Sequence, residues 1–235
     1  MLFSATNNAS VKNFIDPDNH YAFCYGTPNT VATSIVQKFW HVNSHCTSRV
    51  FGVFRSEPVV LPFQAGERPH PFDGIYCLLK KDFMKDKSVL IFVKRTALAD
   101  FIAQRLTIYG LPTVSVHSNQ TCEQRQRFIC FFNDGEVRIM VATNLLTRGT
   151  DLQVDYIINY DLPVEYSEYI HRCGRTGRNQ KGGRAITCVD FDNHDDYSPA
   201  VLRQIALSLE NGNVPDFMAE FVENARKLHT LENED

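Results

Sequence analysis

Three arginines recur at three-residue intervals in the run Tyr169-Ile-His-Arg-Cys-Gly-Arg-Thr-Gly-Arg178. This spacing brings side chains to one face of a helix or 3-10 turn, so we expect Arg172, Arg175 and Arg178 to form a row. The two glycines of the run would let other backbone approach closely. A row of guanidinium groups suits a polyanion, and a nucleoside triphosphate is the first candidate. Taken alone, an Arg-x-x-Arg pair would indicate only a solvated basic turn.

A second run of interest lies upstream, Val141-Ala-Thr-Asn-Leu-Leu-Thr-Arg-Gly-Thr-Asp151, and Tyr156-Ile-Ile-Asn-Tyr-Asp-Leu-Pro163 follows it. A β-rich segment ends at Ala142, a short polar and helical segment comes next, and Arg-Gly-Thr-Asp closes the run. Together with the arginine row, these runs resemble motifs V and VI of the DEAD-box RNA helicases, a branch of the superfamily 2 helicases. The order of the runs and the spacing between them match as well.

The resemblance covers about residues 1–48 and 75–225. Three shorter runs resemble further motifs: Phe3-Ser-Ala-Thr6 motif III, Leu90-Ile-Phe-Val-Lys94 motif IV, and Val116-His-Ser118 with the helix through Arg125 the segment called IVa. The phrases at 92–100 and 213–217 resemble the Vasa-like subgroup. The family implies an α/β fold, the second RecA-like domain of a helicase, with a parallel β-sheet and helices on both faces.

The resemblance also implies roles on a nucleotide side. Arg175 and Arg178 match the arginines that reach across the interdomain cleft to the phosphates of ATP. His171 matches the residue that links this site to the catalytic acid of the first domain. Asp151 matches the carboxylate that accepts a hydrogen bond from the ribose, with Gly149 in the same loop. ATP is therefore the implied cofactor.

A separate set of residues matches groups on the RNA side of the family. The resemblance implies that they hold the sugar-phosphate backbone rather than the bases, so no sequence selectivity is expected. The set comprises Thr143, Arg125, Arg95, Thr96 and His117. Taken singly, Thr143 would be a strand-end cap and Arg125 a solvated helix residue.

Four departures from the family pattern fall on the RNA side. Asn144 stands where motif V has Asp, and Cys122 replaces the glutamine of segment IVa. Ser118 replaces the glycine after the histidine, and Arg95 occupies the threonine position of motif IV, with Thr96 next. We expect weakened or altered RNA contacts.

Two family motifs are absent from the sequence. It contains no Gly-x-x-x-x-Gly-Lys-Ser/Thr run to cradle phosphates, and no Asp-Glu-Ala-Asp run to hold magnesium and position water. Arginine fingers alone do not supply the positioning and the metal that phosphoryl transfer requires. We therefore expect that this chain does not hydrolyse ATP by itself, and that Mg²⁺ takes part only when a first RecA-like domain is present.

Two functional classes follow. The first is the carboxyl half of an ATP-dependent RNA helicase, with the first RecA-like domain supplied in cis or in trans. The second is a non-catalytic RNA-binding or regulatory module that lost the P-loop half. A DNA helicase of the RecQ type has a similar arginine motif, but the Ser-Ala-Thr and Arg-Gly-Thr-Asp forms favour RNA.

Composition limits the partners. The 235 residues are 43% apolar and 22% charged with a net charge of −3, so any RNA contact must come from a local basic surface. No apolar run approaches the roughly 20 residues of a membrane span, and we expect no membrane association. The seven scattered cysteines fit a reducing compartment, and no metal site is expected, since His41 and His45 lie on or beside a strand. We expect a cytoplasmic protein, with ribonucleoprotein granules or the nucleus as alternatives.

The elements that must position these residues alternate along the chain. Short β-branched or aromatic runs predict strands at 35–42, 88–93, 113–116, 137–142, 155–160 and 184–190. Helical periodicity marks 96–109 and 215–228, a capping box opens a helix at 121–124, and Ser198-Pro199 opens another that Asn211-Gly212 would end. Such alternation predicts a parallel sheet whose ligands bind at the carboxyl ends of its strands.

We expect three parts: residues 1–33 as a remnant of the first RecA-like domain and linker, 34–212 as the helicase domain, and 213–235 as a tail helix. An insertion near 49–74 carries four prolines and two glycines between Ser56 and Gly74, which opposes helix and strand. We expect a loop there, as a disordered insertion or a docking loop for a partner, unless it is an error of the gene model.

Overall fold

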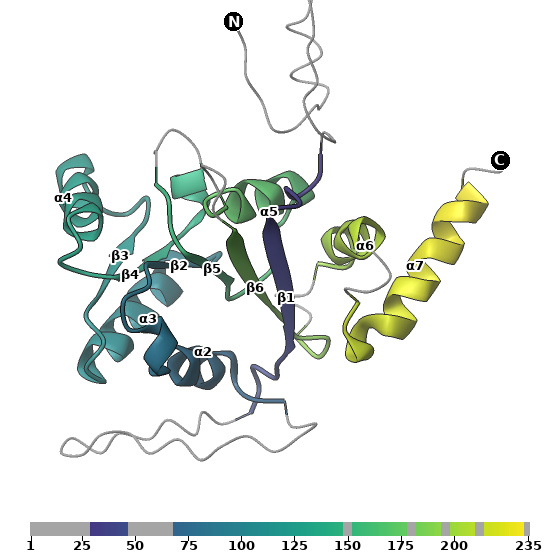
Figure 1. Cartoon of the computed structure of the whole chain (residues 1–235), viewed down its shortest axis with the longest axis horizontal. Coiled ribbons are helices and arrows are strands. Elements are labelled where there is room, and N and C mark those ends of the chain that lie inside the picture. The colour runs from purple at the N-terminus through teal and green to yellow at the C-terminus, as the bar shows by residue number, and fades with distance from the viewer. Residues whose placement is uncertain are drawn as a thin grey trace, which may run out of the picture.

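The computed structural model of the chain describes residues 29–46, 68–147, 152–177, 182–193, 198–209 and 214–232 (Figure 1). Six strands form one parallel sheet in the order β1-β6-β5-β2-β4-β3. Their bounds are β1 Ile35–His41, β2 Val89–Phe92, β3 Thr113–Val116, β4 Ile139–Ala142, β5 Tyr156–Asn159 and β6 Gly183–Val189. Every strand that the sequence predicted is present within two residues of its expected ends.

Helices cover both faces of the sheet. They are α2 Pro71–Leu79, α3 Thr96–Ile108, α4 Cys122–Asn133, α5 Tyr166–Cys173, α6 Pro199–Ser208 and α7 Ala219–Glu232, with short 3-10 turns η1 Asp82–Met84, η2 Asn144–Thr147 and η4 Asp216–Met218. Figure 1 shows α2 and α3 on one side of the sheet and α5 on the other. In the described part of the chain, no helix is long and apolar enough to cross a membrane.

Side chains that alternate along β2 pack into two separate cores, one on each face of the sheet. Leu90 and Phe92 enter the core beneath α4, α5 and α6, whereas Val89 and Ile91 enter the core beneath α2 and α3. All four residues are fully buried. A strand covered on both faces reads as a continuous apolar run, which is why the sequence could predict helices on both faces of a parallel sheet. That fold class is confirmed.

The predicted loop at 49–74 extends too far, because its last four residues belong to a helix. Pro71 to Gly74 form the first turn of α2, while residues 47–67 lie outside the described residues. Pro71 occupies the first helical position, where its fixed φ angle and missing N–H favour the helix. The Nδ1 atom of His70 accepts a hydrogen bond from the N–H of Phe72 at 3.2 Å and caps the helix.

The other predicted helices are present, but some of them begin or end at other residues than expected. The capping box at Thr121 and Gln124 is formed on both sides, and Pro199 opens α6 directly after Ser198. However, α6 ends at Ser208, and the expected stop at 211–212 lies outside the described residues. The tail begins with η4 before α7 continues to Glu232. The division of the chain into three parts stays a prediction.

The cap of α2 makes part of the stability depend on pH. Burial, with help from Arg105, lowers the pKa of His70 below its usual 6.5, although Asp73 opposes the shift. The folded state therefore disfavours the protonated ring, which has no lone pair to accept from Phe72. This stability is complete above pH 6.5 and is lost as the pH falls from there towards the folded-state pKa.

We predict that His70→Asn keeps the cap and removes its pH dependence, since an asparagine side chain accepts the same bond at any pH. The melting temperature of the parent chain should fall more steeply between pH 7.5 and 5.5 than that of the variant. A His70→Ala variant should lose about 1 kcal/mol at pH 7.5 and less at pH 5.5. Parallel melting curves of parent and His70→Asn chains across this range would contradict the assignment.

Candidate functional site

Three loops meet at the carboxyl edge of the sheet. The register pairs Ala142 with Phe92 on one side and with Val116 on the other. Backbone hydrogen bonds continue beyond the strands: the N–H of Val93 donates to the carbonyl of Ala142 at 2.9 Å, and that of Thr143 to the carbonyl of Val116 at 3.3 Å. Open parallel sheets bind ligands at this edge. We call its residues 93–96, 117–121 and 143–147 the loop edge.

Three residues predicted to face RNA lie at or beside the loop edge. Arg95 is exposed directly before α3, and the Oγ1 of Thr96, the first residue of that helix, accepts a hydrogen bond from the Nδ2 of Asn119 at 3.2 Å. Arg125 projects from the start of α4, and its Nη1 donates to the carbonyl of Gln120 at 2.7 Å. Asn119 was not among the predicted residues, because a single exposed amide belongs to no periodic pattern.

The other two predicted RNA residues are covered. Thr143 is 8% exposed and His117 only 3%. The Nε2 of His117 lies 2.9 Å from the Oδ1 of Asp100, which also accepts from the hydroxyl of Ser115 at 2.6 Å. Burial raises the pKa of Asp100, but the hydrogen bonds from Ser115 and His117 lower it by more, so it lies below its usual value. In this conformation His117 positions the loop rather than presenting its ring to a ligand.

The predicted nucleotide residues are described in part. His171 is half-buried in the last turn of α5, and Arg175 follows the helix with 7% of its surface exposed. The backbone of Arg175 is tied to the sheet, since its carbonyl accepts from the N–H of Val154 at 3.1 Å. The remaining members, Arg178, Asp151 and Gly149, lie outside the described residues. Their convergence with Arg175 on one edge stays a prediction.

Arg172, the first arginine of the predicted row, does not face a ligand as expected. Arg172 is fully buried and does not face solvent. Its Nε donates to the Oδ1 of Asn144 at 2.8 Å, its Nη1 donates to the carbonyl of Asp161 at 2.8 Å, and its guanidinium lies 5.3 Å from the centre of the Phe92 ring. Three-residue spacing sets a common face but does not say whether that face points inward.

The charge of Arg172 is balanced locally. Its Nη1 lies 3.6 Å from the Oδ1 of Asp161, a carboxylate that is 4% exposed. The other carboxylate oxygen of Asp161 accepts from the backbone N–H of Lys94 at 2.8 Å. Burial lowers the pKa of Arg172, and the charges of Asp161 and Glu168 oppose that shift. The buried pair thus connects α5 to the loop edge.

Comparison with known proteins agrees with this geometry. Residues 72–180 match the family described as the helicase conserved C-terminal domain. This segment therefore resembles the C-terminal domain of helicases. The match includes β2 to β5, α2 to α5, and the arginine run up to residue 180.

The domain resembles parts of longer helicases. It is 36% identical over 134 residues to the probable ATP-dependent RNA helicase DDX4 of Pelophylax lessonae, covering 56% of this chain and 18% of that protein. It is 35% identical over 130 residues to the ATP-dependent RNA helicase vasa of Drosophila melanogaster, covering 55% and 19%. The matched stretch thus spans about a fifth of these curated relatives. DEAD-box ATP-dependent RNA helicases of Arabidopsis thaliana and Oryza sativa match at the comparable identities of 35% and 38%.

Solved structures share the fold. Dbp5 L327V of S. cerevisiae, bound to RNA and ADP BeF3, aligns with a TM-score of 0.64 at 23% identity over 95% of this chain and 54% of that one. The C-terminal domain of the DEAD-box protein Dbp5 aligns with a TM-score of 0.56 at 25% identity over 83% of this chain and 98% of that one. The expected RecA-like architecture of the helicase C-terminal domain is confirmed.

Two glycines hold the end of the arginine run against β6. Gly177 has a φ of +73°, and a Cβ there would lie 2.7 Å from the Cγ1 of Ile35. A Cβ on Gly183 would lie 2.5 Å from the backbone nitrogen of Gly177. The predicted close approach of backbone is therefore present at Gly177, and its partner is Gly183, the first residue of β6.

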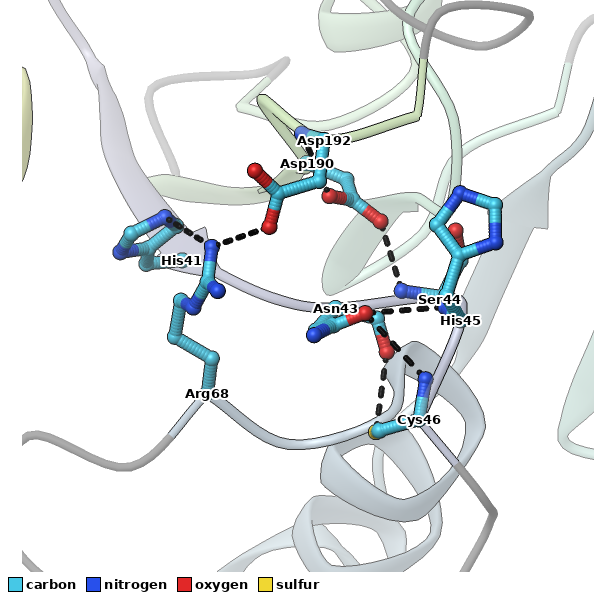
Figure 2. Close-up of polar contacts among 8 residues, drawn as sticks. All are labelled: His41, Asn43, Ser44, His45, Cys46, Arg68, Asp190 and Asp192. Atoms are coloured by element: carbon cyan, nitrogen blue, oxygen red, sulfur yellow. Dashed lines mark hydrogen bonds and ion pairs between the residues drawn. The ribbon is translucent and has the colours of Figure 1, made fainter.

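The residues that flank the predicted insertion, Asn43 to Cys46 and Arg68, are anchored at the same carboxyl edge, beside β1 and β6 (Figure 2). At the entry, the backbone N–H of Ser44 donates to the Oδ2 of Asp190 at 2.6 Å. At the exit, the Nη1 of Arg68 lies 2.6 Å from the Oδ2 of Asp192 and 3.5 Å from the Nε2 of His41. His41 also stacks on Phe217 with a centroid distance of 4.8 Å, which ties η4 to this corner of the sheet.

We predict that Gly183→Ala destabilises the chain by about 1–3 kcal/mol, because the added methyl group would overlap the backbone of Gly177. Gly182→Ala is the matched control, since a Cβ there meets only an ordinary contact, 3.8 Å from the carbonyl of Ser34. Urea unfolding of both variants measures the difference. Equal midpoints would show that the Gly177–Gly183 contact does not constrain the arginine run.

Proposed function

We propose that this chain acts as the second RecA-like domain of an ATP-dependent RNA helicase of the DEAD-box type. It would bind the RNA backbone through the loop edge and contribute arginines to ATP held by a first RecA-like domain, in cis or in trans. The observation that carries the proposal is the helicase C-terminal match at 72–180, which contains the whole loop edge. A Vasa-like subgroup and a cytoplasmic location are finer parts of the same proposal.

The chemistry of the loop edge supports a backbone ligand. Arg95 and Arg125 supply positive charge, while Thr96 and Asn119 supply hydrogen-bonding groups beside it. Such groups bind phosphate and sugar and carry no sequence information directly. Since the whole chain has a net charge of −3, attraction to RNA must be local and should weaken steeply with salt. Thr143 and His117 would act mainly by shaping the loops, as both are nearly buried.

The departures from the family pattern support altered RNA contacts. Ser118 and Cys122 are exposed at the loop edge and the start of α4. The side chain of Asn144 is bonded at both ends within the protein, to Arg172 and Glu168, rather than directed to a ligand. We propose that binding is weaker than in a helicase with the unaltered motifs.

ATP would be held through Arg175, Arg178, Asp151 and Gly149, with His171 connecting the site to the first domain. When bound, ATP supplies a phosphoanhydride whose cleavage can drive domain motion. Arg175 is 7% exposed, so in this conformation little of it is accessible to a phosphate, and the described residues alone do not form a nucleotide pocket. We therefore assign no catalytic step to this chain by itself.

The alternative is a non-catalytic RNA-binding or regulatory module derived from a helicase. The observation in its favour is that the sequence contains neither a phosphate-cradling glycine run nor an Asp-Glu-Ala-Asp run. The two proposals share the RNA surface and differ only in whether a first RecA-like domain completes an ATPase.

We predict that Arg125→Ala weakens binding of a fluorescent oligo-uridine by about threefold to tenfold and lowers the slope of log affinity against log salt by about 0.7. Arg127→Ala is the matched control, because Arg127 is exposed on the same helix and its guanidinium lies 5.2 Å from the Phe131 ring. Anisotropy titrations at 50, 100 and 200 mM KCl measure both effects. Equal losses in the two variants would refute the assigned surface.

We predict that the chain alone shows no Mg²⁺-dependent, RNA-stimulated ATP hydrolysis, and that adding a first RecA-like domain from a DEAD-box relative produces it. Arg178→Ala should then reduce turnover by about 10³-fold, because a finger arginine stabilises charge on the transferring phosphoryl group. Phosphate release is the readout. Hydrolysis by the isolated chain would overturn the first part. Failure of several first domains to restore turnover, with RNA binding intact, would favour the non-catalytic alternative.

A further inference from the structure

The side chain of Asn144 joins a cation to an anion. Its Oδ1 accepts from the Nε of Arg172 at 2.8 Å, and its Nδ2 donates to the Oε2 of Glu168 at 2.7 Å. A guanidinium can only donate and a carboxylate can only accept, so the orientation of the amide is set by its partners. A neutral amide meets both demands at once, whereas a carboxylate at position 144 could meet only the first.

Glu168 and Arg172 are four residues apart on α5, so they lie on the same face of the helix. Asn144, in the 3-10 turn η2 after β4, inserts between them. The first turn of α5 and its last turn are thus both bonded to one side chain of the loop edge.

The same arginine reaches two further strands. Its Nη1 donates to the carbonyl of Asp161, just beyond β5, and Asp161 accepts from the N–H of Lys94, just beyond β2. Its guanidinium lies against the ring of Phe92 at the end of β2. Arg172 therefore connects the loops after β2, β4 and β5 to α5. Two residues with predicted ligand roles lie close to this network in sequence: Thr143 precedes Asn144, and Arg175 is one turn beyond Arg172.

We infer that Asn144 and Glu168 are positioning residues that work as a pair. The amide of Asn144 links the carboxylate of Glu168 to the guanidinium of the buried Arg172 by two hydrogen bonds, and this relay holds the RNA-facing loop after β4 against the arginine-bearing end of α5. The inference rests on the proposed function for what the loops bind, but the pairing itself is a property of this chain.

The pairing has a specific consequence for charge. Around Arg172 the carboxylates of Asp161 and Glu168 already outnumber the single guanidinium. In Asn144→Asp, a new carboxylate would stand within hydrogen-bonding distance of Glu168, and repulsion would raise the pKa of one of the two. Replacing Glu168 with glutamine in the same chain supplies a new amide donor, so that the carboxylate introduced at position 144 could accept from both residue 168 and Arg172.

The test compares the full chain with Asn144→Asp, Glu168→Gln and the double variant. At pH 7.5 we expect Asn144→Asp to lower the melting temperature by about 3–6 °C, and the double variant to recover at least half of that loss. The deficit of Asn144→Asp should shrink as the pH falls from 7.5 to 5, because a proton shared between the carboxylates relieves their repulsion. The double variant should show no such pH dependence.

Oligo-uridine binding provides the second readout. Although Asp is the family residue at this position, in this chain it would face the carboxylate of Glu168. We therefore expect Asn144→Asp to weaken binding by about threefold or more and the double variant to restore it to within twofold of the parent chain. If Asn144→Asp lowers the melting temperature equally in the parent chain and in the Glu168→Gln chain, the inference is overturned, as it is by a deficit that does not change with pH. If Asn144→Asp fails to fold, a folded double variant supports the relay and an unfolded one refutes it.

The two proposals can fail separately. If the parent chain binds no RNA, the proposed function fails, while the melting temperatures still decide whether Asn144 and Glu168 are coupled. If RNA binds but the two substitutions act independently, the relay fails and the proposed function stands.

Discussion

The buried guanidinium of Arg172 is the constraint on which the carboxyl edge of this domain depends. An unpaired cation at a site with no solvent exposure would cost several kcal/mol, so partners must be held in place around it. Asp161, Asn144 and the Phe92 ring meet that demand, and each comes from a different strand end. Such a pair adds little net stability compared with an apolar core. Its effect is to specify how three loops sit relative to α5.

The parallel sheet explains why these polar contacts gather at one edge. Four-residue strands such as β2 and β4 are buried on both faces, so their side chains are restricted to apolar packing. Along β2 and β4, polar side chains begin only where the strands end, and the register places those ends together. The edge therefore carries buried pairs that set loop geometry, such as His117 with Asp100, beside exposed groups such as Arg95.

Sequence patterns predicted the strands well because β-branched and apolar runs bounded by polar residues leave few alternatives to a buried strand. They failed at Pro71 to Gly74, where proline and glycine were taken as breakers although proline favours the first turn of a helix. They also failed at Arg172, since periodicity cannot tell an inward face from an outward one. The relay through Asn144 was beyond sequence reasoning, because it depends on two side chains that meet only after α5 has packed.

The fixed ends of the segment between residues 46 and 68, where an insertion was predicted, indicate how this edge would tolerate extra chain. These two ends are joined directly, since the N–H of Asn43 donates to the carbonyl of Pro69 at 3.1 Å, and each end is also bonded to the segment after β6. Burial raises the pKa of Asp190, but hydrogen bonds from Ser44 and Asp192 lower it by more, so this carboxylate stays charged at neutral pH and holds the entry. Closing a longer loop between ends that are already fixed costs little additional entropy, because that cost grows only with the logarithm of loop length. The sheet and the helix that follows can therefore keep the geometry on which Arg172 and its loops depend, whatever the length of the segment between residues 46 and 68.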